Sequence, residues 1–387
     1  MNTGNNIPLS IPYLKGNEWQ YLKNCLDSEW ISTSGPFVDE FEEKIKKLTG
    51  VNFAVACING TSALQLALKV SGVETNDEVL VPSLTFIATI NSIKYNNAEP
   101  FFLDSDNYYN IDSEKVINFL LTQTSFKEGH SYNSITGKKI KAIIVVHVFG
   151  NAVFLDNLID LCKERNIKVI EDATESLGTN YIEGKYKNHH SGSVGDIGCL
   201  SFNGNKIITT GGGGMLITNN EEYFNQSKYF STQAKDDSFN YIHNQIGYNF
   251  RLTSLQSALG LAQLEQLDSI MELKKKIRNS YINKFKKLDG LDIAKTPQYS
   301  DNNNWLNILR IDNSVSKKSK EDILINHQKQ NIGSRPIWYL NHLQRPYKNN
   351  GSYKLENAIR LFKNSICLPS SASLSDEEID RVVENCK

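Results

Sequence analysis

The sequence lacks a long apolar run, an excess of charge of one sign and a targeting segment, and each absence excludes a class of protein. No apolar run in the 387 residues approaches the roughly 20 needed to cross a bilayer. The 42 basic and 43 acidic side chains leave a net charge of −1, which gives no general field for holding nucleic acid. The first residues, MNTGNNIPLSIPYL, have neither a basic start nor a long apolar core. We therefore expect a soluble, cytoplasmic protein that binds neither membrane nor nucleic acid.

Cysteine motifs are also missing. The six cysteines are scattered, without a C-x-x-C pair that would indicate a metal or redox site, so we expect most of them to be buried small apolar residues. They are Cys25, Cys57, Cys162, Cys199, Cys367 and Cys386. A run of three lysines at 274–276 lies in a helical stretch and is typical of a solvated helix face.

The apolar segments that are present predict an α/β fold. From residue 51 to residue 219, short apolar runs alternate with amphipathic stretches, as parallel strands joined by helices do. Expected strands lie at 52–57, 78–81, 99–104, 141–146 and 167–170, and expected helices begin near 59 and span 83–95 and 155–165. Residues 105–139 show few apolar periods, and we expect them to leave the sheet.

A second, smaller domain is predicted at the C-terminal end. From about residue 264 the chain has a long Lys-rich helical pattern, a loop at 302–305 and shorter mixed elements. The expected domains are therefore 1–263 and 264–387, since a chain of this length exceeds the usual span of one core.

One lysine precedes a run of glycines, in SFNGNKIITTGGGGMLIT at residues 201–218. A phosphate-binding P-loop needs the lysine after the glycines, and a dinucleotide fingerprint needs a glycine three residues beyond Gly213, so neither motif fits. A different interpretation is that Lys206 is a nucleophilic amine that forms a Schiff base with a carbonyl, for which an aldehyde cofactor would be the natural partner. The glycines that follow would let the backbone turn tightly where side chains would crowd a pocket.

Pyridoxal phosphate is such a cofactor, and it needs a helix start for its phosphate, a carboxylate for its ring nitrogen and an aromatic face for its ring. Thr61 and Ser62 open a helix after the strand at 52–57, although they could simply cap it. Asp172 ends an apolar strand, where it could also be an ordinary cap. Phe86 could cover the ring, although a phenylalanine in an apolar helix usually belongs to the core.

The order of these features resembles one family, the sugar-nucleotide aminotransferases of the DegT/DnrJ/EryC1/StrS family. The matching motifs are NGTSAL at 59–64, EDATES at 171–176, SFNGNK at 201–206, TTGGGG at 209–214 and GYNFR at 247–251. The resemblance implies the fold of pyridoxal-phosphate enzymes of type I, that of aspartate aminotransferase. In that fold a large domain with a mixed, mostly parallel sheet precedes a smaller C-terminal α/β domain.

The resemblance also implies a role for each matching residue. Lys206 would bind the cofactor covalently and Asp172 would pair with its ring nitrogen, which makes these two the catalytic residues. The other implied cofactor contacts are Thr61, Ser62 and Ser201 at the phosphate, Glu175 near the phenolic oxygen, Phe86 over the ring, and Asn249 and Arg251 from a neighbouring subunit. The last two imply a homodimer with shared active sites. Many relatives have Gln or His at the position of Glu175 and Glu at that of Gly212.

Several other polar residues have weaker signals. Ser34, Arg335 and His342 lie where relatives approach the sugar, although Arg335 and His342 could equally make an interdomain contact. His147 ends a strand and is as readily a structural residue as a catalytic one. The pair at 189–190 lies in a polar loop without further ligand spacing, so we expect no metal site.

The sequence therefore predicts an aminotransferase that moves the amino group of glutamate to a nucleotide-linked keto sugar. Residues 7–19 and 338–347 most resemble the branch that aminates C4 of a UDP- or GDP-linked 4-keto-6-deoxy-N-acetylglucosamine in bacillosamine and legionaminic acid synthesis. A GDP-perosamine synthase is the alternative within the family. A dehydratase relative would have histidine in place of Lys206, and a non-enzymatic sugar-sensing relative would be expected to have lost Lys206 or Asp172.

Overall fold

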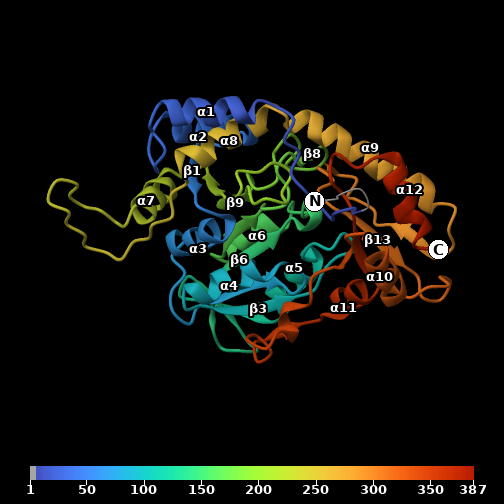
Figure 1. Ribbon diagram of the computed structural model, residues 1–387. Helices are drawn as coiled ribbons and strands as arrows, with labels where there is room; N and C mark the ends of the chain where they lie inside the picture. Colours follow the sequence, from blue (N-terminus) through green and yellow to red (C-terminus); the bar gives the residue numbers. More distant parts are fainter. Residues whose placement is uncertain (1–5) are drawn as a thin grey trace.

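The computed structural model describes residues 6–387, and its main feature is a large twisted sheet with helices on both faces (Figure 1). Residues 1–5, part of the stretch in which we expect no targeting signal, lie outside the described residues. The strand order is β1 (Phe53–Cys57), β10 (Gly214–Thr218), β9 (Ile197–Ser201), β7 (Lys168–Asp172), β6 (Lys139–Val146), β2 (Glu78–Pro82), β3 (Glu99–Leu103) and β15 (Ser352–Tyr353).

The pairing is parallel from β9 through β7, β6, β2 and β3 to β15, and β10 runs antiparallel between β9 and β1. The predicted mixed, mostly parallel sheet is thus confirmed. Because side chains alternate along each strand, Ile144 and Val146 of β6 enter one core while Ile143 and Val145 enter another. Both faces of this strand are therefore buried, as its continuous apolar run requires.

Helices cover the two faces of the large sheet. The helices of the large part are α1 (Glu18–Asp27), α2 (Pro36–Thr49), α3 (Gly60–Val70), α4 (Ile87–Tyr95), α5 (Ser113–Thr122), α6 (Leu158–Glu164), α7 (Glu221–Ser231) and α8 (Ser254–Glu265). Helices α3 and α4 supply apolar side chains to one face, and α5 and α6 supply them to the opposite face. The crossover helices lie where the sequence predicts them, although α4 begins four residues later than the expected start at 83.

The expectation that residues 105–139 leave the sheet is wrong. This segment contains α5 and a hairpin of β4 (Thr124–Lys127) and β5 (His130–Asn133), and β5 pairs antiparallel with the start of β6. The hairpin has mixed, half-buried side chains because it lies at the sheet margin, so its sequence carries no clear apolar period.

A second sheet lies in the C-terminal part, in the order β11 (Leu291–Ile293), β13 (Asn307–Ile311), β16 (Ser365–Leu368) and β14 (Arg335–Pro336). It packs against α9 (Leu267–Phe285), α10 (Lys320–Lys329) and α12 (Asp376–Glu384), while α11 (Glu356–Lys363) joins the large core. Two short strands, β8 (Asn180–Tyr181) and β12 (Ser300–Asp301), pair with each other. The domain division at 263/264 stays a prediction, and β15 from the C-terminal part joins the large sheet.

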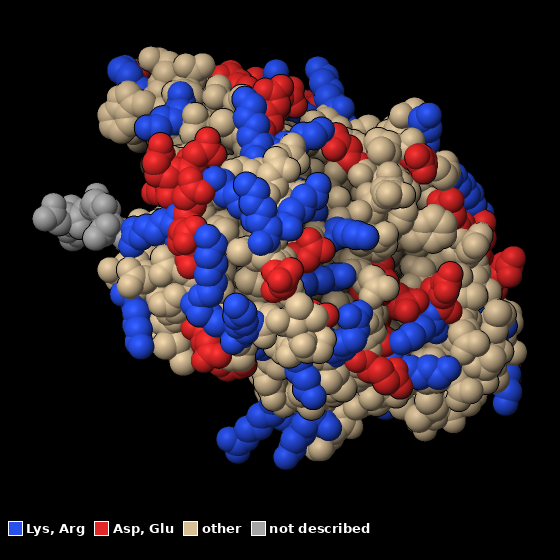
Figure 2. Space-filling view, turned by 90° about the vertical axis from the view of Figure 1, so that its right-hand side faces the viewer, with Lys and Arg blue, Asp and Glu red and all other residues tan. Residues whose placement is uncertain are grey.

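The surface and the buried cysteines agree with the composition. Figure 2 shows Lys and Arg side chains interspersed with Asp and Glu side chains over the face in view. All six cysteines are buried and free, which confirms the expectation for them. No helix within residues 6–387 is long and apolar enough to cross a bilayer.

The lysine run on α9 is only partly a solvated face. Lys275 and Lys276 are exposed, but Lys274 is 3% exposed, and its Nζ donates hydrogen bonds to the carbonyls of Trp305 (3.0 Å) and Ser370 (2.6 Å). Burial lowers the pKa of the Lys274 amine to about 7. The expectation of solvation is therefore wrong for Lys274, because α9 passes under two loops that approach from distant parts of the chain.

Candidate active site

A cavity of about 260 Å³ lies at the carboxyl ends of the parallel strands, where ligands of open α/β sheets bind. Six residues predicted for the site line it together: Thr61, Phe86, Asp172, Glu175, Ser201 and Lys206. They come from separate elements, and the sheet brings them to one edge. Side chains from the 203–206 turn, the loop at 302–305 and the segment after β14 close the cavity.

Asp172 lies at the last position of β7 and is 2% exposed. Thr89 Oγ1 of α4 donates a hydrogen bond of 2.7 Å to its Oδ2, and the Thr174 N–H lies 3.2 Å from its Oδ1. These two donors fix the orientation of the carboxylate toward the cavity. Thr89 has no sequence signal of its own, since a threonine inside an apolar helix is common.

The N-terminus of α3 forms another wall. The Asn59 side chain caps the helix by accepting the Ser62 N–H at 2.7 Å, and the first turn of a helix leaves N–H groups free for an anion. A Cβ on Gly60 would lie 3.0 Å from Ser201 Cβ and 3.3 Å from Ser201 Oγ. A glycine here lets the helix start approach Ser201, and this cradle of hydroxyls and N–H groups fits a phosphate. Ser62 itself is buried and does not line the cavity.

Lys206 lies in a turn after β9. Its Nζ is 3.7 Å from Glu175 Oε1 and 4.3 Å from the ring centroid of Trp305. The indole N–H of Trp305 donates to the Asn205 carbonyl at 2.6 Å, which ties the 302–305 loop to the turn that carries Lys206. Within residues 6–387, Lys206 is the only basic side chain among those that line the cavity.

Glu175 is buried, and its Oε2 accepts the Phe149 N–H at 2.8 Å. Burial raises the pKa of Glu175 to about 7, and the nearby Lys206 amine and Phe149 N–H oppose that rise. This carboxyl can therefore be neutral or charged near neutral pH. A glutamine at this position would not titrate.

One wall of the cavity is aromatic and was not predicted from the sequence. Trp305 and Trp338 stack with ring centroids 6.4 Å apart, and Trp338 stacks on Phe149 at 4.7 Å. Phe86 is 53% exposed rather than part of the core, and its ring lies 6.5 Å from Trp338. The available signal is a tryptophan that ends the polar run NNNW, since such a ring in a loop must find an apolar partner elsewhere.

The glycine run after Lys206 is required at most, but not all, of its positions. Gly211 has φ +79°, and a Cβ on Gly214 would lie 2.4 Å from the Asn59 backbone. Gly212 has no atom within 3.8 Å of its virtual Cβ, so a side chain fits there. The expected tight turn is thus found at Gly211 and the expected crowding at Gly213 and Gly214, whereas Gly212 has room for a side chain.

Two predicted cofactor contacts lie outside this cavity. Arg251 lines a separate hollow of about 360 Å³ with Glu42 and Lys228, and Asn249 is exposed. Both follow residues 233–248, here called the arm, which projects from the body after α7 (Figure 1). The arm carries Phe239 and Ile246, which are 89% and 88% exposed. Large apolar side chains so exposed on a projection are typical of a contact with another chain.

The three predicted substrate contacts also lie outside the lining of the cavity. His342 Nδ1 lies 2.6 Å from Ser83 Oγ, so it ties the segment after β14 to the end of β2. Arg335 is exposed in β14, and Ser34 is exposed before α2. Their assignment to the substrate stays a prediction.

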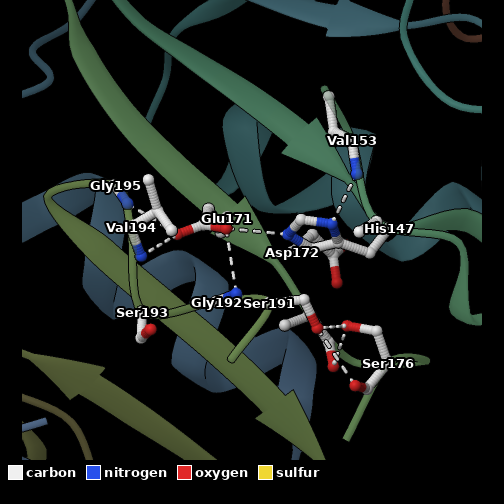
Figure 3. Close-up of polar contacts among 12 residues, drawn as sticks. His147, Val153, Glu171, Asp172, Ser176, Ser191, Gly192, Ser193, Val194 and Gly195 are labelled. Carbon is white, nitrogen blue, oxygen red and sulfur yellow. Dashed lines mark hydrogen bonds and ion pairs between the residues drawn. The ribbon is translucent and has the colours of Figure 1, made fainter. Parts of the chain in front are cut away.

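The histidines at 147, 189 and 190 lie outside the lining of the cavity. His147 is buried and contacts Glu171 and Val153 (Figure 3). His190 is buried and accepts the Gly178 N–H at 2.8 Å, whereas His189 is exposed. Within the described part of the chain, no group of three ligand side chains could hold a metal ion.

Comparisons with known proteins find aminotransferases. The sequence model of the DegT/DnrJ/EryC1/StrS aminotransferase family matches residues 12–387. The chain is 37% identical to the putative pyridoxal phosphate-dependent aminotransferase EpsN of Bacillus subtilis, over 98% of this chain and 94% of that protein. It is 36% identical to the GDP-perosamine synthase of Escherichia coli O157:H7, over 98% and 97% of the two chains. The PLP form of the putative sugar aminotransferase Spr1654 from Streptococcus pneumoniae superposes with a TM-score of 0.85 at 26% identity, over 99% and 98%.

Proposed function

We propose that this chain, which belongs to the DegT/DnrJ/EryC1/StrS aminotransferase family, transfers the amino group of glutamate to C4 of a nucleotide-linked 4-keto-6-deoxy sugar. Relatives of this chain are named as a pyridoxal phosphate-dependent aminotransferase and as GDP-perosamine synthases. The observation that carries the proposal is the opposition of Lys206, Asp172 and the N-terminus of α3 across one cavity. An amine, a fixed carboxylate and an anion cradle are the three groups that this chemistry requires.

The residues of the cavity fit the cofactor. Thr61, Ser201 and the first turn of α3 would bind its phosphate, and Asp172 would keep a proton on its ring nitrogen. When bound, pyridoxal phosphate withdraws electrons from the carbon that carries the amino group and so weakens the C–H bond there. The hydrogen bond from Thr89 to Asp172 keeps the carboxylate aimed into the cavity. Phe86 and Trp338 line the cavity and would cover one side of the cofactor ring.

Lys206 would act as the proton carrier. Its Nζ would hold the cofactor through the aldehyde. As a free amine, Nζ would take the proton from the donor carbon and would return a proton to the sugar carbon when the keto sugar is aminated. Glu175, 3.7 Å from Nζ, is the nearest acid to this amine.

The site would be completed by a second copy of the chain. A phosphate carries about two negative charges, but Lys206 is the only base among the described residues that line the cavity, and it is committed to proton transfer. Arg251 and Asn249 lie outside their own cavity, next to the projecting arm. A homodimer in which each arm reaches the neighbouring cavity would bring that missing cation to the phosphate.

For the sugar we propose an N-acetylated substrate. The motivation is the resemblance of the segments at 7–19 and 338–347 to enzymes that act on acetamido sugars, together with the rings of Trp305 and Trp338, against which an acetyl methyl group could pack. GDP-linked 4-keto-6-deoxymannose, the perosamine precursor, is the second candidate, favoured by the identity with GDP-perosamine synthases. A non-enzymatic sugar sensor is disfavoured because both Lys206 and Asp172 are present.

The test is a comparison of kcat/KM for the acetamido and the C2-hydroxyl keto sugars, each on UDP and GDP, with glutamate as donor. A pocket shaped for the acetamido group leaves polar groups unpaired with the hydroxyl sugar, which costs on the order of 1–3 kcal/mol, or roughly ten- to hundredfold. Equal or better turnover of the hydroxyl sugar would overturn the substrate assignment. Failure with every keto sugar would overturn the proposed reaction.

A further inference from the structure

We propose that His147 is a positioning residue for Glu175: anchored by Glu171, it holds the turn at 148–150 so that the Phe149 N–H binds the carboxyl next to Lys206. The inference rests on the proposed function, because it matters to catalysis only if Lys206 is the reacting amine. His147, Glu171 and Phe149 lie behind the cavity and do not line it, whereas Glu175 and Lys206 do.

The anchor is the fully buried Glu171 carboxylate. Its Oε1 accepts the N–H groups of Val194 (2.7 Å) and Gly195 (2.6 Å), and its Oε2 accepts the Gly192 N–H (2.9 Å). The same Oε2 lies 2.8 Å from His147 Nε2 (Figure 3). These donors lower the pKa of Glu171 despite its burial, so it is a fixed negative charge. Glu171 and Asp172 are adjacent on β7 and point to opposite faces of the sheet.

The protonation state of His147 follows from its two contacts. The Val153 N–H lies 3.1 Å from Nδ1 and can only donate, so Nδ1 carries no proton. Nε2 must then carry the ring proton and donate it to Glu171. The ring therefore bridges a fixed charge on β7 and the backbone just beyond the turn at 148–150.

That turn is strained, and it is held from several sides. Phe149 has φ +57°, a left-handed conformation that bulky residues rarely adopt. The Val148 N–H donates to Asn110 Oδ1 (2.9 Å), and Thr179 Oγ1 donates to the Gly150 carbonyl (2.9 Å). Val153, fixed by His147, closes the far end. Strain of this kind persists only where the surroundings impose it.

The strained conformation of Phe149 directs its N–H toward the carboxyl of Glu175. The Phe149 N–H points at Glu175 Oε2, at 2.8 Å, while Oε1 faces Lys206 Nζ. The charged and titratable groups that face Glu175 are Lys206 from the turn after β9, Asp172 from β7 and Cys367 from β16. Neither Asp172 nor Cys367 stabilises the charged form of Glu175, so the Phe149 N–H and the Lys206 amine are the groups that do.

The test separates the two nitrogen atoms of His147. In His147→Asn the side-chain oxygen can replace Nδ1 as the acceptor for Val153, whereas in His147→Gln the amide nitrogen can replace Nε2 as the donor to Glu171. The readout is the pH midpoint of the absorbance of the bound cofactor in the holoenzyme, which needs no turnover. Loss of one hydrogen bond to a charged group would shift the midpoint by about one pH unit. We expect that shift in His147→Gln, which loses the direct bond to the backbone beyond the turn, and a smaller shift in the same direction in His147→Asn, which keeps that bond but loses its anchor at Glu171.

Two controls distinguish positioning from general damage. In a Glu175→Gln background, His147→Gln should no longer shift the midpoint, because the group through which it acts has been removed. His190→Asn removes another buried histidine, one that contacts Gly178 and not the turn, and should leave the midpoint unchanged. A shift that persists without Glu175, equal shifts in the two His147 variants, or no shift at all would overturn the proposal.

Thr179→Val gives a second route if His147→Gln does not fold. This variant removes the hydrogen bond to the Gly150 carbonyl and so loosens the same turn from its other side, and it also removes the acceptor of the Asn303 N–H (3.1 Å). It should shift the midpoint in the same direction as His147→Gln, and an unshifted midpoint would contradict the role of the turn. Because the measurement uses bound cofactor only, a wrong sugar assignment leaves these outcomes unaffected.

Discussion

Glu175 Oε1 lies 3.7 Å from Lys206 Nζ, and the two side chains are 3% and 13% exposed. At this separation, the charge of the buried amine affects the protonation of the buried acid, and the reverse also holds. Since burial raises the pKa of Glu175 to about 7, one of the two partners titrates near neutral pH.

Glu175→Gln should remove a pH-dependent part of stability from the cofactor-free enzyme. The pKa of Glu175 is raised above its ordinary value of 4.5, so the folded state binds more protons than the unfolded state between pH 4.5 and about 7. Stability due to this group is complete below pH 4.5 and falls by up to about 1.4 kcal/mol per pH unit as pH rises to 7. Urea unfolding of both proteins from pH 5 to 8 measures the slope. Identical slopes would contradict the raised pKa.

Lys206→Ala should abolish turnover and leave thermal unfolding within a few degrees of the wild type. The loss falls on chemistry, since the Lys206 side chain lines the cavity and is not part of an apolar core. Borohydride reduction of the wild-type holoenzyme should attach the cofactor to the peptide that contains residue 206. A label on the buried Lys274 or any other lysine would show that the wrong amine has been assigned.

Asp172→Asn should retain the fold and lose most of the rate. A neutral amide can keep the hydrogen bond from Thr89 but cannot keep a proton on the ring nitrogen of the cofactor. Single-turnover kinetics should show a loss of at least about a hundredfold in the proton-transfer step, the lower range for a group of this kind. Thr89→Val is the matched control, expected to have a smaller effect, because it frees the carboxylate without removing its charge.

Mixed dimers test the shared site. Lys206→Ala subunits and Asn249→Ala/Arg251→Ala subunits should each be inactive as homodimers. After mixing, about a quarter of the wild-type activity is expected, since half of the dimers are mixed and one site in each has all its parts. Differently tagged subunits allow the mixed dimers to be isolated. Their complete inactivity would argue that each site is built from one chain.

Lys274→Met should flatten stability in the alkaline range. The pKa of the Lys274 amine is lowered from 10.5 to about 7, so the unfolded state binds more protons between these values and stability rises with pH there. The slope due to one group is up to about 1.4 kcal/mol per pH unit. Unfolding at pH 7 and 9 should show a smaller difference in Lys274→Met. Lys275→Met, which changes an exposed neighbour, should keep the wild-type slope.

The groups that could be predicted from the sequence are those whose signal is local. Asp172 ends an apolar strand, Gly60 and Thr61 open a helix directly after another, and Lys206 stands before glycines in an order that excludes the common phosphate loops. Strand ends of a parallel sheet meet at one edge, so the cavity follows from the alternation of strands and helices. The motif resemblance then supplied the cofactor.

The groups that could not be predicted depend on contacts between distant segments. Trp305 precedes β13 and Trp338 follows β14, so their stacking depends on how the second sheet arranges these two strands. Lys274 looks like its exposed neighbours in sequence, and only the loops that cross α9 bury it. The role proposed for His147 depends on its contact with Glu171, which lies on the neighbouring strand. None of these pairs leaves a periodic signal.

The strand β15 has a consequence for access to the cavity. The chain passes between the two sheets at residues 8–17, along α9 and again on either side of β15, which is anchored beside β3. Two sheets that are joined by several chain segments resist rotation about a single hinge. Opening the cavity would then depend on small side-chain and loop movements near Phe86 and Trp338. Truncation of the chain anywhere before β15 would remove the edge strand of the large sheet as well as part of the second sheet.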